Sequence, residues 1–406
     1  MTTLLIIAIL VGFYVAWNIG ANDVANAVGP SVGSGALSLV QAVIIAAIFE
    51  FCGAFLLGSN VSETLESGIV DPTLFALNNH DYILGMLGAL IGTGVWLQVA
   101  SYFGWPVSTT HTIVGGVLGF GLVYGGFTSI YWDTIWSIAA SWVISPLMGG
   151  ALGYLFFSII RKRILYHSSP FRAMLRATPY FAFSIFFLIT LIMLFGGLRG
   201  LDFHLNTIAV LIVAICIGII AALFAKLLLK KELKQESSYD KVEKIFSYLL
   251  IVIACFMAFA HGSNDVANVI GPLSAIVNGL QGRPLFGQSV PLWLLLLGGG
   301  GIVVGLATWG WRVIETVGKK ITSLTPSRGF AAGFAAALTI MLASKLGLPI
   351  STTHVLVGAV LGVGFARGIG AINLGTLRDI ALSWVITVPA GAGSSIVFFY
   401  ILKSIF

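Results

Sequence analysis

Charge is scarce in this sequence. Asp, Glu, Lys and Arg together make up 9% of its 406 residues, while 58% are hydrophobic. A soluble domain carries about a quarter charged residues, so a soluble globular fold is excluded. The long apolar runs also lack the alternation of apolar and polar residues that is typical of a membrane β-barrel. Many windows of about 20 residues carry almost no charge, which is the length a helix needs to cross a bilayer. The composition predicts an all-α polytopic membrane protein.

Cysteine is also scarce. Cys52, Cys216 and Cys255 stand singly in apolar stretches, which predicts small buried hydrophobes rather than disulfides or a zinc site. No basic residue precedes the first apolar stretch, so it lacks the charged region of a cleavable signal peptide and is expected to belong to the mature fold. No basic groove with interleaved aromatic residues is present, and no nucleic-acid partner is expected.

Basic residues are concentrated in short segments, which indicates how the chain is oriented. Residues 161–176 hold five Arg and Lys residues and no acid, and a second basic segment runs from Lys226 to Lys244. Because cytoplasmic loops are enriched in Lys and Arg, both segments are predicted to be cytoplasmic. Two apolar spans, near 179–198 and 207–229, lie between them. The formal charge of +6 comes largely from these two segments and indicates how the chain is oriented in the membrane.

Counting the apolar segments outward from these loops predicts where the chain begins and ends. Five segments precede the first basic loop, near residues 4–30, 36–58, 82–104, 107–126 and 130–159. A chain that crosses five times and ends inside begins outside. A loop with four acids and no Lys or Arg is therefore expected to face the external water; its acids are Glu63, Glu66, Asp71 and Asp81.

The second half mirrors the first. Five corresponding segments follow Lys244, so the second half is predicted to be inverted, with both termini extracellular or periplasmic. We divide the chain into a first repeat at 1–160, basic loops with two connecting spans at 161–244, and a second repeat at 245–406, with about 12 membrane segments in all. Inverted repeats around a central site are a transporter design. Residues 82–126 fit either two crossings or one re-entrant hairpin, because both leave the next segment on the same side.

A polar motif stands inside an apolar segment of each repeat. Asn22-Asp-Val-Ala-Asn26 returns as Asn264-Asp-Val-Ala-Asn268. A carboxylate within a membrane segment is costly and indicates function. The glycines and proline around the first copy predict a break or kink in its helix. The oxygens of Asn22 and Asp23, and those of Asn264 and Asp265, suit a hard cation such as sodium. The alternative is that the amides and glycines only hold close-packed helices together.

A second motif is also written twice. Pro106-Val-Ser-Thr-Thr-His111 returns as Pro349-Ile-Ser-Thr-Thr-His354. Each copy is typical of a helix start, where free N–H groups, hydroxyl donors and the positive end of the helix dipole can hold an anion without formal charge. The alternative is that the hydroxyls only cap their helices. The predicted anion-binding residues are Ser108, Thr109, Thr110, Ser351, Thr352 and Thr353, with Asn26 and Asn268 beside them.

The two kinds of site require each other. An anion beside two intramembrane aspartates is repelled unless cations bind as well, and no arginine stands near either motif to replace them. The sequence therefore predicts coupled transport of an anion with cations by alternating access. An anion channel and an intramembrane enzyme are the alternatives. Adjacent Ser, Thr and His residues on a helix do not point together, and no Asp is placed to orient the histidines, so no enzymatic activity is expected.

These paired motifs resemble those of the inorganic phosphate transporter (PiT) family, of the sodium/phosphate symporter type, over both halves of the chain. The resemblance implies an inverted-repeat fold with helical hairpins, extracellular termini and symport of phosphate with sodium or protons. We expect inorganic phosphate and sodium as transported ligands, no other cofactor, and a multi-pass protein of the cell (plasma) membrane surrounded by lipid. Proton-coupled phosphate or sulfate symport is the alternative, and a homodimer is left open.

Three further residues are candidates for accessory roles. Glu50 lies within the second apolar segment, where it could assist a cation or pair with an amide. His111 and His354 end the Ser-Thr-Thr motifs, and imidazole titrates near neutral pH, which would suit proton coupling. The oxygen-rich Asn-Asp sets favour sodium instead. His261 replaces Ile19 in the second copy, so the two cation sites are not identical.

Overall fold

The computed structural model describes residues 2–71, 73, 79–196, 206–230, 238–284, 288, 290–314, 324–368 and 374–406. The first repeat forms α1 (Thr2–Gly33), α2 (Leu39–Leu57), α3 (Ser59–Ser67), α4 (Asn79–Phe103), α5 (Thr109–Gly125) and α6 (Trp132–Ile160). Two helices follow, α7 (Pro170–Gly196) and α8 (Thr207–Leu229). The second repeat forms α9 (Tyr239–Asp265), α10 (Ala267–Leu280), α11 (Leu292–Thr308), α13 (Pro326–Lys345), α14 (Thr352–Arg367) and α15 (Leu374–Ile405).

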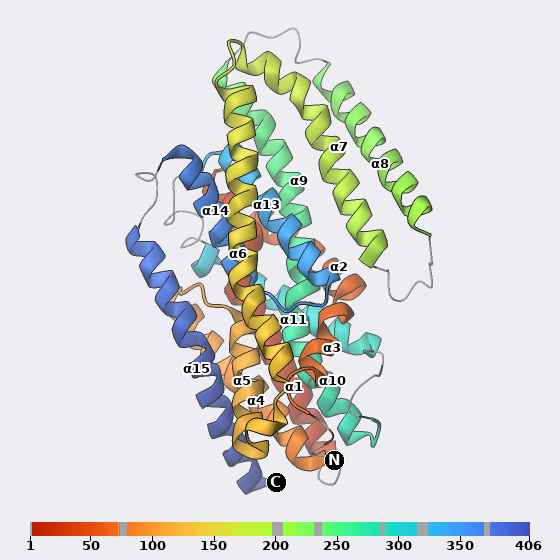
Figure 1. The fold of residues 1–406 in the computed structure, drawn as a ribbon, viewed down its shortest axis with the longest axis vertical. Coiled ribbons are helices and arrows are strands. Elements are labelled where there is room, and N and C mark those ends of the chain that lie inside the picture. The colour runs from red at the N-terminus through yellow and green to blue at the C-terminus, as the bar shows by residue number, and fades with distance from the viewer. Residues whose placement is uncertain are drawn as a thin grey trace.

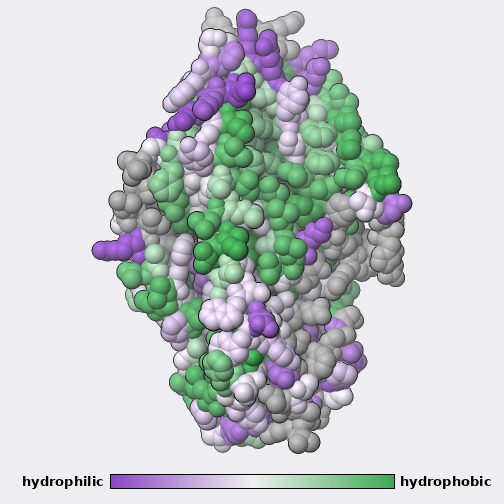
Figure 2. Space-filling model, viewed as in Figure 1, coloured by the Kyte–Doolittle hydropathy of each residue, from purple (hydrophilic) through white to green (hydrophobic). Residues whose placement is uncertain are grey.

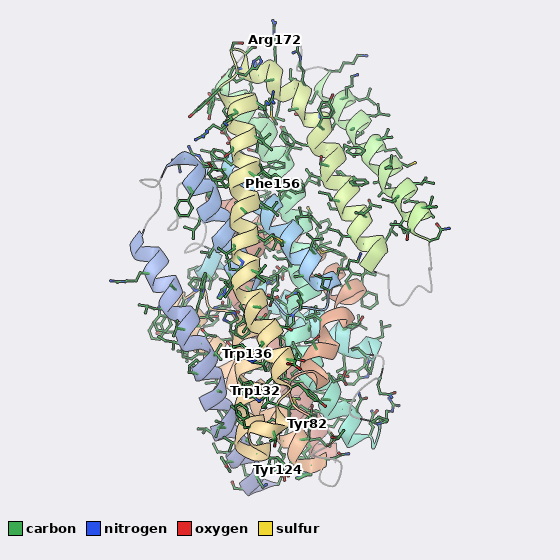
Figure 3. All side chains as sticks on the ribbon, viewed as in Figure 1. Tyr82, Tyr124, Trp132, Trp136, Phe156 and Arg172 are labelled. Carbon is green, nitrogen blue, oxygen red and sulfur yellow. The ribbon has the colours of Figure 1, made fainter. Side chains whose placement is uncertain are left out.

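The fold class predicted from composition is confirmed. Within the described ranges, nine helices are long and apolar enough to cross a membrane, and one of these spans joins α9 to α10. The helices α5, α11 and α14 are shorter, at 17, 17 and 16 residues. Both chain ends lie at one end of the molecule, and Arg172, in the first turn of α7, lies at the other (Figures 1 and 3). This agrees with an odd number of crossings before the first basic loop.

The outer surface is apolar over the middle of the bundle. Figure 2 shows hydrophobic side chains over the middle and hydrophilic ones gathered at the end that carries the basic loops. Helix α8 contributes Ile212, Ile220 and Phe224, which are all exposed. Cys216 is exposed on the same helix, contrary to the expectation of a buried thiol. An apolar side chain that faces lipid is not exposed to water, so hydropathy alone cannot distinguish these helices from buried ones.

Helices of one repeat pack against helices of the other. Helix α1 meets α11, where Gly20 lies against the carbonyl of Ile302 and Gly305 against that of Trp17. The related pair is α9 and α2, where Gly262 lies against the carbonyl of Glu50. A Cβ atom at any of these glycines would overlap main-chain oxygen, so only glycine permits the approach. The two repeats are interleaved.

Two further helix pairs show the same exchange. Helix α5 meets α15, with Gly115 against the carbonyl of Val388, and α14 meets α6, with Gly358 against that of Pro146. Gly358 lies 243 positions after Gly115, which is close to the spacing of the polar motifs. The internal symmetry seen in the motifs therefore extends to the backbone contacts.

Two helical hairpins reach the centre of the molecule from opposite ends. The α4–α5 hairpin enters from the end that carries the termini, and the α13–α14 hairpin enters from the other (Figure 1). At their tips, Thr110 donates to the carbonyl of Ile350 over 3.0 Å, and Thr353 donates to that of Val107 over 3.3 Å. Residues 82–126 therefore form a re-entrant hairpin rather than two crossings.

A break or kink was predicted in the helix around the first aspartate motif, but a break occurs at the second copy instead. Helix α1 is continuous through Asp23 to Gly33, whereas α9 ends at Asp265 and α10 begins at Ala267. The first copy therefore has no break in its helix, and Gly20 there serves close packing against α11.

The acidic segment before α4 also differs from expectation. Glu66 is buried on α3, where its Oε1 accepts hydrogen bonds from Ser274 over 3.0 Å and from Asn278 over 3.1 Å. Asp81 is buried beside Lys403, 3.1 Å away. Polar partners on neighbouring helices thus replace the external water predicted for these two acids. The side chain of Glu63 lies outside the described residues.

Candidate functional site

The two Ser-Thr-Thr motifs start helices, as predicted. Ser108 caps α5 and accepts a hydrogen bond from the backbone N–H of His111 over 3.1 Å. Ser351 caps α14 in the same way, with the N–H of His354 at 3.2 Å. Capping fixes the first turn and aims the positive end of each helix dipole at the hairpin tip. The serines are therefore occupied as caps, while the threonines beside them point elsewhere.

Each first threonine donates to the aspartate of its own repeat. Thr109 Oγ1 lies 2.8 Å from Asp23 Oδ2, and Thr352 Oγ1 lies 2.9 Å from Asp265 Oδ2. All four residues are buried. A hydroxyl has a single hydrogen to donate, so neither threonine can donate to anything else while this bond stands.

The asparagines at the ends of the motifs reach across to the opposite repeat. Asn26 donates to Thr353 over 2.8 Å and lies 3.4 Å from Thr352. Asn268 lies 3.2 Å from the hydroxyls of both Thr109 and Thr110. Each threonine pair is thus held by an aspartate from one repeat and an asparagine from the other. The residues predicted from two distant motif copies form one central cluster.

Asn22 and Asn264 lie to the side of this cluster. Asn22 Nδ2 donates to Ser101 Oγ and to the carbonyl of Trp105, each over 3.1 Å, and the Asn264 amide contacts Ser344 Oγ at 3.0 Å. Asn22 Oδ1 and Asp23 Oδ1 are buried and accept no hydrogen bond from any described residue. Buried oxygens without donors suit a cation ligand set, which fits the predicted role of this pair.

The second aspartate has a neighbour that the first one lacks. His261 Nε2 lies 2.9 Å from Asp265 Oδ2, and its Nδ1 lies 3.2 Å from Glu50 Oε1. All three side chains are fully buried. Ligand atoms of Asp23, His261 and Asp265 lie within 4.8 Å of one another. Glu50, predicted as an accessory residue, therefore meets this group through an imidazole rather than directly.

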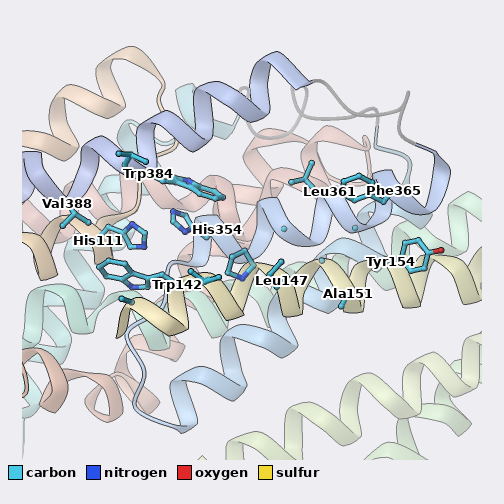
Figure 4. Close-up of a pocket in the computed structure, with 17 residues that line it drawn as sticks. His111, Trp142, Leu147, Ala151, Tyr154, His354, Leu361, Phe365, Trp384 and Val388 are labelled. Atoms are coloured by element: carbon cyan, nitrogen blue, oxygen red, sulfur yellow. The ribbon is translucent and has the colours of Figure 1, made fainter. Parts of the chain in front are cut away.

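His111 and His354 lie behind the threonines and away from the aspartates. Each ring packs on a tryptophan, His111 on Trp142 with ring centroids 3.8 Å apart and His354 on Trp384 at 3.6 Å. The two histidine rings meet at 4.3 Å. Figure 4 shows the four rings gathered at one end of a pocket. The structure does not bring these histidines to the carboxylates.

The cluster contains carboxylates, hydroxyls and amides but no basic side chain from the first repeat. Residues 1–160 include no Lys and no Arg. Two unit charges about 5 Å apart repel by roughly 3 kcal/mol at an effective dielectric constant of 20, so the aspartates disfavour an anion by about this amount each unless cations accompany it. The cluster joins the residues predicted to bind an anion to those predicted to bind cations, through the hydrogen bonds from Thr109 to Asp23 and from Thr352 to Asp265.

Several residues of the cluster were not predicted. Ser101 and Ser344 each lie seven positions before the capping serine of their repeat, and Trp142 and Trp384 are 242 apart. The tryptophans belong to a third repeated motif, Ser141-Trp-Val-Ile and Ser383-Trp-Val-Ile. A systematic comparison of the two halves could have found all four. No repeat could have revealed the role of His261, because it stands in only one copy.

Known proteins resemble this chain over nearly its whole length. The model of the Phosphate transporter family matches residues 19–395. A Chlamydia muridarum protein named "Putative phosphate permease" is 52% identical over 100% of both chains. The Arabidopsis thaliana protein "Inorganic phosphate transporter 2-1, chloroplastic" is 43% identical over 98% of this chain and 72% of its own length.

A solved structure gives the same result for the fold. The structure titled "The sodium-dependent phosphate transporter" superimposes with a TM-score of 0.93, at 40% identity, over 100% of both chains. The resemblance noted from the paired motifs is thereby confirmed, as is the all-α architecture with inverted repeats and hairpins. This multi-pass membrane chain belongs to the Phosphate transporter family.

Proposed function

We propose that the chain is a sodium-coupled symporter of inorganic phosphate that works by alternating access. The observation that carries this proposal is the pair of hydrogen bonds from Thr109 to Asp23 and from Thr352 to Asp265. Each bond joins a predicted anion-binding hydroxyl to a predicted cation-binding carboxylate. The cation and the anion therefore compete for the two partners of one hydrogen bond: the cation for the carboxylate, and the anion for the hydroxyl.

Cation binding releases the anion donors in this scheme. A sodium ion at Asp23 satisfies the carboxylate charge and competes with the Thr109 hydroxyl for Oδ2. The hydroxyl is then able to turn toward an anion at the hairpin tips, joined by the amide of Asn268 and the N–H groups that begin α5. The same exchange at Asp265 frees Thr352. Phosphate binding is thus favoured only after the cations have neutralised the carboxylates, which is coupling in the thermodynamic sense.

The buried oxygens proposed as cation ligands favour sodium over protons as the coupling ion. Asn22 Oδ1 and Asp23 Oδ1 are buried oxygens without hydrogen-bond donors among the described residues, and hard oxygen ligands suit an alkali cation. The related solved structure is titled as a sodium-dependent transporter. His111 and His354, the residues that would suit a proton route, stack on tryptophans instead of meeting the aspartates.

Alternating access rests on the two hairpins. Their tips meet through Thr110 and Thr353, and each tip closes the cluster from one end of the molecule. Withdrawing one hairpin opens the cluster to one side while the other stays closed. The positive-inside rule supports a cytoplasmic location for the end that carries Arg172, and we place both termini outside, in a protein of the cell membrane. The chain acts as a transporter and not as an enzyme.

Phosphate uptake into proteoliposomes tests this proposal. Purified protein is reconstituted, and labelled phosphate is supplied under an inward sodium gradient, an inward proton gradient, or neither. Accumulation above equilibrium is expected with sodium alone. Accumulation driven by protons alone would show that the coupling ion is wrong. If excess unlabelled sulfate suppressed the uptake of labelled phosphate to the same extent as excess unlabelled phosphate, the assignment of phosphate as the transported anion would be wrong. Uncoupled equilibration in all three conditions would indicate a channel.

A further inference from the structure

An apolar groove runs along the outside of α6 and carries no role in the transport cycle described above. It has a volume of about 730 Å³ and is lined by α6, α14 and α15, with His111 from α5 at one end. Ligand sites in proteins commonly enclose about 300–1,000 Å³. Leu147, Val143 and Val385 line it and are at least 61% exposed, so the groove opens sideways onto the surface that faces the membrane.

The groove is elongated, and its two ends differ. Figure 4 shows His111, His354, Trp142 and Trp384 together at one end, with Tyr154 and Phe365 at the other. The ring cluster lies behind the hairpin tips and closes the groove at the centre of the molecule. Trp142 and Tyr154 are twelve residues apart on one helix, which corresponds to about 18 Å. Half of a bilayer hydrocarbon core is about 15 Å, so the groove has the length of one leaflet.

The open end of the groove leads to basic residues. Leu147, Ala151 and Tyr154 recur on α6 at the three- and four-residue spacing of one helix face. The same spacing continues to Arg161 and Lys162, about 10 Å beyond Tyr154. Arg161 Nη1 bonds the carbonyl of Ala366, next to the groove residue Phe365. Its Nε is buried without a hydrogen bond to any described residue, and Lys162 is exposed.

We propose that this groove binds one acyl chain of an anionic phospholipid, whose phosphate lies at Arg161 and Lys162. The groove offers carbon-lined volume at bilayer depth, and the basic pair offers donors and positive charge at the level of the head groups. Basic pockets between membrane helices on the cytoplasmic side are suited to anionic head groups by the same chemistry. The methyl end of the acyl chain would rest against the rings of His111 and His354.

Lipid retention by the purified protein tests the proposal. Native mass spectrometry is performed on protein incubated with phosphatidylglycerol or with phosphatidylcholine of identical acyl chains. Ala151→Trp fills the groove from its exposed side, and Ala140→Trp places the same side chain at an exposed position of α6 outside the groove. Phosphatidylglycerol should be retained by the native chain and by the Ala140 variant, and lost from the Ala151 variant.

The head-group contact is tested separately. Lys162→Gln should weaken phosphatidylglycerol binding by roughly fivefold, since one basic residue near a membrane surface contributes about that factor. Lys226→Gln, an exposed lysine in the last turn of α8, should leave it unchanged. Equal retention of both lipids would overturn the proposal, as would unchanged retention in Ala151→Trp. The same spectra report subunit number, and a dimer that Ala151→Trp alone dissociates would assign the groove to a second copy of the chain and also overturn it.

Discussion

His261 Nε2 lies 2.9 Å from Asp265 Oδ2, and the matching position beside Asp23 is Ile19. The two halves of the site are therefore chemically different although their backbones are related by symmetry. A buried polar group that loses its partner costs about 1–3 kcal/mol. His261 lies between the carboxylates of Glu50 and Asp265.

The first prediction concerns this imidazole. His261→Ile copies the residue of the first repeat and leaves Glu50 and Asp265 without their shared neighbour. We expect a lower thermal unfolding midpoint in detergent and loss of phosphate uptake. His261→Gln should restore part of both, because its amide can still donate to one carboxylate. If His261→Ile kept native stability and native sodium dependence, the imidazole would be a passive filler.

The second prediction concerns the aspartates. Asp23→Asn and Asp265→Asn keep the volume and one oxygen at each site but remove the charge that we propose holds a cation. Sodium-driven phosphate uptake should fall to the background of empty liposomes in both variants. Size-exclusion chromatography provides the control for folding. Normal uptake in both variants would rule out the cation sites assigned to these residues.

The third prediction concerns the threonine hydroxyls. Thr109→Val and Thr352→Val remove a hydroxyl at nearly constant volume. A hydrogen bond to a charged group contributes about 1.5–3 kcal/mol, which corresponds to roughly a 10- to 100-fold rise in the phosphate concentration needed for half-maximal uptake. Thr112→Val on the next turn of α5 is the matched control, because its hydroxyl donates to the carbonyl of Ser108 within its own helix. An unchanged phosphate requirement in Thr109→Val and Thr352→Val would reduce these hydroxyls to local structure.

The fourth prediction concerns helix packing. Gly305→Ala places a methyl group against the main-chain oxygen of Trp17, which cannot rotate away. Overpacking of this kind costs about 1–3 kcal/mol or more. Gly300 lies on the same helix with no neighbour within 4 Å of an added Cβ, so Gly300→Ala should be neutral or slightly stabilising. Thermal unfolding of both variants decides the matter, and equal midpoints would contradict the close approach of α1 and α11.

Much of the site could be predicted because its chemistry is unusual for a membrane. Asp23 and Asp265 could be identified because a carboxylate within a membrane segment costs free energy. The helix caps at Ser108 and Ser351 could be predicted because each serine stands directly before a helical run. Local rules decide both features, since helix starts depend on a few neighbouring residues.

What the sequence could not supply is which distant residues meet. Helical spacing places Asp23 and Asn26 on one face, but it does not say that Asn26 meets Thr353 of the other repeat. Glu66 was expected in water because its segment is polar, yet Ser274 and Asn278 of α10 hold it inside. Pairing between helices depends on close backbone approach at glycines such as Gly20 and Gly305, and the sequence does not say which of its 49 glycines serve this purpose.

The interleaving of the repeats has a consequence for how the chain is made. Asn26 enters the bilayer with α1, but Thr353, its hydrogen-bond partner, is synthesised 327 residues later. Helix α1 likewise waits for α11 before its glycine face is covered. The contacts between the two repeats therefore cannot form while only the first half has been made, and Asp23 spends that interval without His261 and Asp265 near it. The central cluster is thus complete only after the second hairpin has been made, and α5 gains its packing partner α15 later still.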